Sequence, residues 1–367
     1  MNHQSCEFIV DRAQLHVSKV IPLTIPTAAT LVSGQVLLKI DHFAFTANNV
    51  TYAAFGTAMK YWNFFPTVSG WGNIPVWGFA DVVLSTVDGI AVGQRYYGYY
   101  PMATHLCVTP GRFHAGGFSD TAPHRQEMHG LYNQYLLTDA DPAYTAASEA
   151  EQMLLRPLFI TSFMIDDFLD QQQYFGATDI LISSASSKTA YGLAFLLAQR
   201  QSVRLIGLTS AANRAFVESL GVYHEVHCYE DLAALDAGHA VAYVDMAGNA
   251  SLRAALHEKY QDQMRYSCAV GGTHWDELGG AQHLPGARPV LFFAPAQIKL
   301  RLADWGPAGL QARVADAWQR FMQPVLHADQ PWLRVQHGRG AAAVVSLVER
   351  MLAGQVSADE GHVLSLN

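Results

Sequence analysis

Short apolar runs alternate with amphipathic stretches from Thr178 to Pro295. Thr189 to Arg200 and Ala211 to Leu220 have helical patterns, and Ser210 and Gly221 suit the start and the end of the second helix. This rhythm favours a parallel sheet with right-handed crossovers, as in a doubly wound dinucleotide-binding (Rossmann) domain. The six predicted strands are Ile180 to Ser184, Arg204 to Thr209, Glu225 to Tyr229, Ala240 to Asp245, Tyr266 to Val270 and Val290 to Phe293.

The flanking regions follow a different pattern. Residues 1 to about 110 are rich in strand signals and predict a small β-barrel, and a polar, irregular stretch follows to about residue 150. The last part of the chain does not continue the alternation of strands and helices, so we expect it to return to the first domain. The predicted domains are therefore residues 1–155 with 296–367, and residues 156–295.

A helix is predicted from Leu158 to Gln171, with an apolar face toward the core. Three acidic residues, Asp166, Asp167 and Asp170, fall largely on the other side of this helix. They resemble a catalytic pair, but we interpret them as a solvated helix face.

Charge limits the classes of partner. The net charge is -8 and the chain has only six lysines, so it lacks the clustered cations that nucleic acids and anionic membranes require. No apolar segment is long enough to predict a membrane span. The start of the chain lacks the basic and apolar pattern of a signal peptide, and we expect a cytoplasmic protein.

The cysteines and histidines do not predict a metal site. The four cysteines are far apart in sequence and form no C-x-x-C pair, which argues against a structural zinc site. The histidines lack nearby residues that would complete a ligand set, so we expect no bound metal.

The stretch from Ile180 to Ala194 is the main functional signal, because it reads as a buried strand, a turn of small residues and a helix. That geometry places backbone N–H groups and a helix N-terminus against a pyrophosphate. Serine or alanine replaces the usual glycines, so the motif is weak, and a serine-rich connection without a ligand stays an alternative. The predicted pyrophosphate-binding residues are Ser186, Ser187, Lys188 and Thr189.

The second predicted strand ends at Thr209 and Ser210 without an Asp or Glu. Rossmann domains that prefer NAD usually place an acid there for the ribose 2′-hydroxyl, whereas a 2′-phosphate requires a cation and neutral donors. Ser210, Asn213 and Arg214 meet that requirement, and Tyr229 is a further candidate. The expected cofactor is therefore NADPH.

Several motifs resemble the medium-chain dehydrogenase/reductase superfamily, and most closely its zinc-free quinone oxidoreductase and enoyl reductase branch. Gly34 to Ile40 is similar to the family's G-E-V-L-V-K-V strand, and Val87 to Arg95 resembles the segment ending in V-G-D-R. Ser219 to Gly221 with Glu225 to Tyr229 is similar to the quinone reductase pattern S-L-G-A-x-x-V-I-x-Y. The resemblance covers most of residues 30–350 and implies an α/β fold, in which a Rossmann domain is inserted in a GroES-like, barrel-type catalytic domain.

The resemblance also implies an activity, transfer of hydride from NADPH to an enone, enoyl or quinone-type substrate. Gly271, Gly272 and Thr273 would lie beside the nicotinamide. The catalytic G-H-E of the zinc-dependent branch is absent from Val76 to Val83, so a zinc mechanism is unsupported. The family's Asn-x-x-Asp element corresponds to Thr46 to Tyr52, where Tyr52, Asn48 and Asn49 are the candidate donors to the substrate carbonyl.

Two other classes of NADPH-binding protein are alternatives to this enzyme. A short-chain reductase is excluded, because no tyrosine stands four residues before any of the six lysines. A protein that binds NADPH for redox sensing or structure, without turnover, remains an alternative. For the enzyme we expect a small apolar or aromatic carbonyl substrate and a homodimer.

Overall fold

The computed structural model describes residues 5–270 and 284–367, which form two compact units. Unit 1 comprises Met1–Leu154 and Leu333–Asn367, and unit 2 comprises Leu155–Trp332. Within the described residues, no helix is long and apolar enough to cross a membrane.

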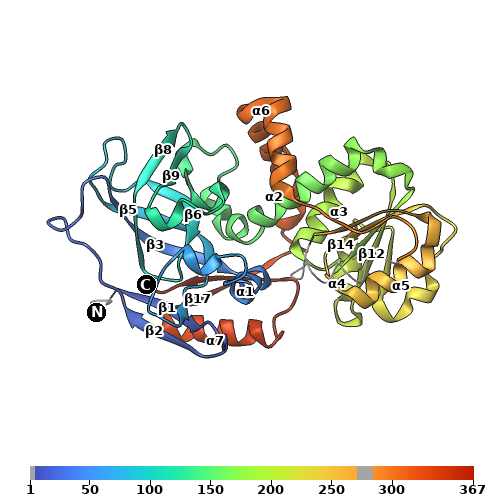
Figure 1. Cartoon of the computed structure of the whole chain (residues 1–367), viewed down its shortest axis with the longest axis horizontal. Coiled ribbons are helices and arrows are strands. Elements are labelled where there is room, and N and C mark those ends of the chain that lie inside the picture. The colour runs from blue at the N-terminus through green and yellow to red at the C-terminus, as the bar shows by residue number, and fades with distance from the viewer. Residues whose placement is uncertain (1–4, 271–283) are drawn as a thin grey trace. The chain divides into compact units, whose positions relative to one another are not determined.

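Unit 1 is built mainly of antiparallel strands (Figure 1). One sheet has the order β2-β1-β4, and the other has the order β17-β18-β3-β5-β6-β10-β9-β8, with β7 also paired to β3. The strands are β1 Cys6–Asp11, β2 Ser18–Pro22, β3 Val36–Phe45, β4 Trp71–Gly72, β5 Val76–Ser85, β6 Arg95–Tyr100, β7 His105–Val108, β8 Pro110–His114, β9 Gly117–Asp120, β10 Gln134–Leu137, β17 Arg334–Arg339 and β18 Glu360–Ser365. The helices are α1 Ala47–Ala54 and α7 Gly340–Leu352.

The core of unit 1 forms where these strands turn their apolar side chains inward. Val36, Leu38 and Ile40 share one face of β3, since side chains alternate along a strand, and they are almost fully buried in the apolar core of unit 1. At Gly98 in β6 the backbone lies so close to the ring of Tyr135 that a Cβ atom would approach it to 2.6 Å. Glycine there permits β6 and β10 to pack around that ring.

Unit 2 contains a six-stranded parallel sheet with the order β13-β12-β11-β14-β15-β16. The strands are β11 Asp179–Ser183, β12 Arg204–Thr209, β13 Glu225–Cys228, β14 Val241–Asp245, β15 Met264–Ala269 and β16 Val290–Leu291. The helices are α2 Glu149–Gln171, which starts in unit 1, α3 Lys188–Arg200, α4 Arg214–Ser219, α5 Ala250–Tyr260 and α6 Ala294–Val325.

The two faces of this sheet have separate apolar clusters. Ile180 and Ile182 pack with Leu193 of α3 and Ile165 of α2, whereas Leu181 packs with residues of α5 on the other face. Strands with apolar side chains on both faces are typical of a parallel sheet covered by helices on both sides. The predicted fold class, with its doubly wound sheet, is therefore confirmed.

Two sequence-based expectations for unit 2 require correction. The chain stays with unit 2 as far as Trp332 rather than 295, because the rings of Phe321 in α6 and Trp332 pack against Tyr191 in α3. The predicted helix from Ala211 to Leu220 is a 3-10 turn at Ala211–Asn213 followed by the short helix α4.

The acidic residues on α2 are not a solvated face. Asp166 is 4% exposed and receives two hydrogen bonds from Arg200, both at 2.8 Å. Asp167 is 9% exposed and accepts from Gln297 and from Arg301 of α6, each at 2.6 Å. Only Asp170 is substantially exposed, with 47% of its side chain accessible. Partners far away in sequence thus allow two of the three acids to be buried.

Candidate functional site

The order of strands in unit 2 defines where a ligand is expected. From β11 the chain builds outward through β12 and β13, and then returns to place β14 on the other side of β11. The connections after β11 and β14 therefore leave the sheet edge in opposite directions. Ligands of doubly wound sheets bind in the crevice at the carboxyl ends of such strands.

The connection between β11 and α3 is a tight turn built without glycine. Ser184 adopts a left-handed conformation with φ of 50°, and its carbonyl accepts a 2.8 Å hydrogen bond from the Ser187 N–H. Ser187 then caps α3, because its hydroxyl accepts from the Ala190 N–H at 3.3 Å. Ser184 thus adopts a positive φ, a conformation that glycine adopts more readily.

Two hydrogen bonds bring the predicted cofactor-binding residues of separate loops together. The Ser184 N–H donates to the Tyr229 hydroxyl at 2.9 Å, and the Asn213 side-chain amide donates to the Ser186 hydroxyl at 3.2 Å. The loops that follow β11, β12 and β13 are thus joined at one edge of the sheet. Lys188 and Thr189 form the first turn of α3 beside them.

Arg214 is the only cation between the end of β12 and the start of α4, and Ser210 precedes the 3-10 turn that leads to it. The Arg214 Nε donates to the Glu218 carboxylate at 2.8 Å, and both side chains are about half exposed. This i,i+4 ion pair on the surface is of the weak kind. Arg214 directly follows Asn213 in the chain, but its guanidinium group is paired with Glu218.

Two buried polar residues at this edge were not anticipated from the sequence. Ser183 and Asp245, the last residues of β11 and β14, are both fully buried, and the Ser183 hydroxyl donates to Asp245 at 3.0 Å. Polar residues directly after apolar runs, in Ile-Leu-Ile-Ser and Ala-Tyr-Val-Asp, were the available signal. The predicted nicotinamide-side residues Gly271, Gly272 and Thr273 lie outside the described residues.

In unit 1, the three candidate donors lie on α1 but have different roles. The Asn49 oxygen accepts from the Thr46 N–H at 2.7 Å and from its hydroxyl at 3.0 Å, while the Asn49 amide donates to the Pro75 carbonyl at 2.8 Å. Both ends of this buried amide are therefore used to start α1 and to fix it to a loop. Asn48 donates to the Tyr52 hydroxyl oxygen at 2.7 Å, so only these two of the three candidates form a pair.

Tyr52 belongs to an aromatic cluster formed by Tyr52, Tyr61, Phe64, Phe65 and Tyr99, with Trp77 and Tyr132 packed against it. The ring centroids of Tyr52 and Tyr61 are 4.6 Å apart, and those of Trp77 and Tyr99 are 5.0 Å apart. Burial raises the pKa of Tyr52, although the hydrogen bond from Asn48 acts in the opposite direction. The cluster thus keeps neutral phenols, which can donate hydrogen bonds, in an apolar setting.

Unit 1 also contains Asp41, His42 and Glu149, the one group within the described residues with the donors and spacing for a metal ion. Arg95 already occupies this group: it donates to Asp41 at 2.9 Å and to both oxygens of Glu149 at 2.7 Å. The His42 ring bridges the same carboxylates, at 2.8 Å from Asp41 and 3.0 Å from Glu149. The arrangement is an ion-pair network in which Arg95 is a permanent cation and His42, when protonated, is a second one.

This network shifts the pKa values of its members. Burial disfavours the charged imidazole of His42, but hydrogen bonds to Asp41 and Glu149 outweigh it and raise the His42 pKa. The His42 hydrogen bond holds the pKa of Asp41 well below its usual range. For Glu149, burial is outweighed by hydrogen bonds from Arg95 and His42, which hold its pKa at about 2.

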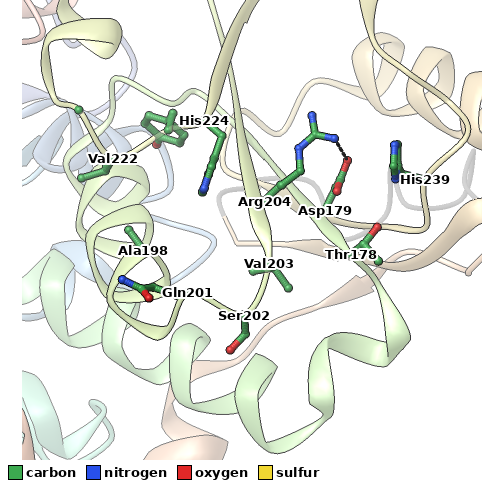
Figure 2. A pocket seen from close by; sticks show the side chains of 12 residues that line it. Thr178, Asp179, Ala198, Gln201, Ser202, Val203, Arg204, Val222, His224 and His239 are labelled. Atoms are coloured by element: carbon green, nitrogen blue, oxygen red, sulfur yellow. Dashed lines mark ion pairs between the residues drawn. The ribbon is translucent and has the colours of Figure 1, made fainter.

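A separate depression of about 750 Å³ opens at the opposite edge of the unit 2 sheet, where β11 and β12 begin. Figure 2 shows Asp179 and Arg204 paired there, with His224 and His239 on either side. An oxygen of the Asp179 carboxylate lies 3.6 Å from a guanidinium nitrogen of Arg204. This edge holds the amino ends of the strands, so it is not the edge at which the β11–α3 turn and Asn213 meet.

Unit 2 has the strand order of a doubly wound Rossmann domain and unit 1 is rich in antiparallel strands, and comparisons with known proteins agree. Residues 43–357 match the family described as "Protein of unknown function (DUF2855)", and the chain belongs to that family. No curated protein matches the sequence.

Solved structures show the same fold over almost the whole chain. CurA from Vibrio vulnificus, solved in complex with NADPH, is 12% identical with a TM-score of 0.64, and the match covers 99% of each chain. The quinone oxidoreductase from Coxiella burnetii is 14% identical with a TM-score of 0.55, covering 99% of this chain and 100% of its own. CurK enoyl reductase is 12% identical with a TM-score of 0.56, covering 99% of each chain. The resemblance inferred from the motifs is thus confirmed at the level of the fold.

The His42 network predicts a pH dependence of stability. Because the folded-state pKa of His42 is raised, its contribution is fully present below its unfolded pKa of about 6.5 and is lost as the pH rises through the folded value. The lowered pKa values of Asp41 and Glu149 act at the other end: their contribution is present above their unfolded values and is lost as the pH falls through the folded ones.

We therefore expect His42→Asn to lower the denaturation midpoint more at pH 6 than at pH 9. Chemical unfolding of the wild type and of His42→Asn between pH 6 and pH 9 measures the difference between their denaturation midpoints. His239→Asn is the control. The His239 side chain is 43% exposed, and its 3.4 Å ion pair with the exposed Asp236 lies at the surface. A His42→Asn deficit that is the same at every pH would contradict the charged bridge.

Proposed function

We propose that the protein is an NADPH-dependent, zinc-independent reductase that transfers hydride to an enone, enoyl or quinone-type small apolar substrate. The observation that carries the proposal is the edge where three loops meet, with the left-handed Ser184, the capped α3 and the Ser186–Asn213 contact. A turn of this kind followed by a helix N-terminus binds anionic groups through backbone N–H donors. The fold shared with an NADPH-bound protein supports the same cofactor.

The residues around this edge suit NADPH rather than NADH. Ser186, Ser187, Lys188 and Thr189 form the turn and first residues of α3, where a pyrophosphate would bind. Ser210, Asn213 and Arg214 follow β12, with no acid among residues 209–214 to repel a 2′-phosphate. Arg214 would exchange its exposed partner Glu218 for the phosphate, which accepts stronger charge-assisted hydrogen bonds. Tyr229 contacts the same turn through Ser184.

NADPH, when bound, supplies the hydride. In an enone the new C–H bond forms at the β-carbon, the π electrons move to the carbonyl oxygen, and an enolate results. The chain's part is to hold a proton at that oxygen and to exclude water.

Tyr52 is the best candidate for this role. Its oxygen already accepts a hydrogen bond from the Asn48 amide at 2.7 Å, which leaves its own proton for donation. The aromatic cluster around it would suit a flat, apolar carbonyl compound.

The cofactor assignment predicts a specific effect of Arg214→Ala. The variant should bind NADPH about tenfold to hundredfold more weakly, because it loses a charge-assisted contact to the 2′-phosphate, and should bind NADH unchanged. Fluorescence titration of both nucleotides measures this. The control is Arg320→Ala, which removes a similarly exposed arginine in an i,i+4 pair with Asp316. Equal affinities of the wild type for NADPH and NADH would refute the assignment.

The proton-donor role predicts that Tyr52→Phe loses about 10²–10³ in kcat while the NADPH Kd stays near that of the wild type. Steady-state oxidation of NADPH with a panel of enones and quinones measures turnover. Tyr135→Phe is the matched control: Tyr135 is equally buried in unit 1, but its hydroxyl donates to the Tyr99 carbonyl at 2.9 Å. Normal turnover by Tyr52→Phe would exclude the role. Saturable NADPH binding without turnover of any substrate would favour the sensing or structural alternative.

We further propose that the enzyme works without zinc and as a homodimer. Arg95 fills the one described group with metal-ligand spacing. Among the described strands β16 ends the sheet, paired only with β15, and Val290 of β16 and Phe293, just after it, are 42% and 56% exposed. Unpaired edge strands with apolar neighbours readily associate.

Native mass spectrometry tests both statements in one measurement. The expected species is a dimer of the 40.2 kDa chain without bound metal. One retained zinc per chain, or a monomer at micromolar concentration, would contradict the corresponding statement.

A further inference from the structure

Ser183 and Asp245 end the two strands between which the strand order reverses. Ile182 and Val244 are directly paired in the sheet, so the two polar residues follow at the same level of the crevice. Each is 0% exposed. Burial of a serine and a carboxylate side by side requires that both be fully hydrogen-bonded.

The contacts of Ser183 meet that requirement and reach across the crevice. Its hydroxyl donates to Asp245 Oδ1 at 3.0 Å and accepts from the backbone N–H groups of Met246 and Ala247 at 3.0 and 3.1 Å. One serine oxygen on β11 therefore holds the chain that leaves β14.

Asp245 completes the arrangement from the other strand. Its Oδ1 also accepts from the Gly248 N–H at 2.9 Å, and its Oδ2 accepts from Arg253 Nη1 of α5 at 3.0 Å. Arg253 is itself buried, at 7% exposed, and neutralises the carboxylate. A bare carboxylate at this edge would repel a pyrophosphate, whereas the paired one fixes the turn at residues 246–248 without a net charge.

We propose that Ser183 and Asp245 are positioning residues for the dinucleotide, which hold the two diverging loops of the crevice in register. Ser183 directly precedes the left-handed Ser184, so the position of its side chain sets where the pyrophosphate turn begins. Neither residue would touch the cofactor. The proposal rests on the proposed NADPH site and adds to it the two residues that shape that site from beneath.

The experiment compares two buried serines of the same sheet. Ser183→Ala removes the acceptor of the Met246 and Ala247 N–H groups. Ser267→Ala, on β15, removes a hydroxyl that is equally buried but bonded to His257 at 3.0 Å. Both variants should lose stability, since both lose a buried hydrogen bond.

Only Ser183→Ala should weaken NADPH binding, with a Kd about tenfold higher, and kcat at saturating NADPH should be retained. Ser183→Thr keeps the hydroxyl and should restore most of the affinity. Ser267→Ala should keep its Kd within twofold of the wild type.

Hydrogen exchange of the wild type provides a measurement that needs no variant. NADPH should slow exchange at residues 246–248 more than at residues 236–240, the turn that enters β14 at the opposite edge of the sheet. This result would show that the crevice turn, rather than the whole unit, responds to the nucleotide.

The outcomes separate the two proposals. A wild type that does not bind NADPH contradicts the proposed function. A wild type that binds NADPH, together with a Ser183→Ala Kd within twofold of the wild type or an equal weakening by Ser267→Ala, overturns the positioning role alone. Equal slowing of exchange at both turns also overturns it.

Discussion

The reversal of strand order between β11 and β14 is the constraint on which the candidate site depends. In a parallel sheet all strands end at the same edge. The loops that follow neighbouring strands are therefore crowded there unless they leave in opposite directions. Only between β11 and β14 do they diverge, and there the protein places buried polar residues instead of apolar ones. The Ser183–Asp245 contact and the turn at Ser184 both follow from that local need.

The turn at Ser184 shows how the site is built without the usual glycines. A left-handed conformation costs a residue with a Cβ on the order of 1 kcal/mol, and the contacts around Ser184 offset this cost. Its N–H donates to the Tyr229 hydroxyl, its carbonyl accepts from Ser187, and the neighbouring Ala185 carbonyl accepts from the Tyr223 hydroxyl at 3.1 Å. Tyrosines that follow or precede β13 thus replace the conformational freedom of glycine with fixed hydrogen bonds. The result is a preorganised turn rather than a flexible one.

The sequence predicted what depends on local periodicity and missed what depends on distant partners. Apolar runs placed the four central strands of unit 2, β11, β12, β14 and β15, within two residues of their observed ends, because these strands are buried on both faces. The same reasoning assigned Asp166 and Asp167 to solvent, since Arg200 and Arg301 lie 34 and 134 residues away and no periodicity reveals them. Asn49 is a similar case, because its amide is committed to Pro75, 26 residues along the chain. The residue types near the site could be read from sequence, but the atoms left for a ligand could not.

Unit 1 holds its ionisable groups in two different ways, and this difference bears on the proposed donor role of Tyr52. In the aromatic cluster burial raises the pKa values of Tyr52, Tyr61 and Tyr99, so these phenols stay protonated through the neutral range. A donor of this kind gives a hydrogen bond to a developing oxyanion without any change of charge in the resting protein. Elsewhere in unit 1, the carboxylates of Asp41 and Glu149 are instead paired with Arg95 and His42, where opposite charges compensate each other. Under the proposed mechanism, a pH dependence of turnover between pH 6 and 9 would therefore not originate in the phenol of Tyr52, because burial holds its pKa well above this range.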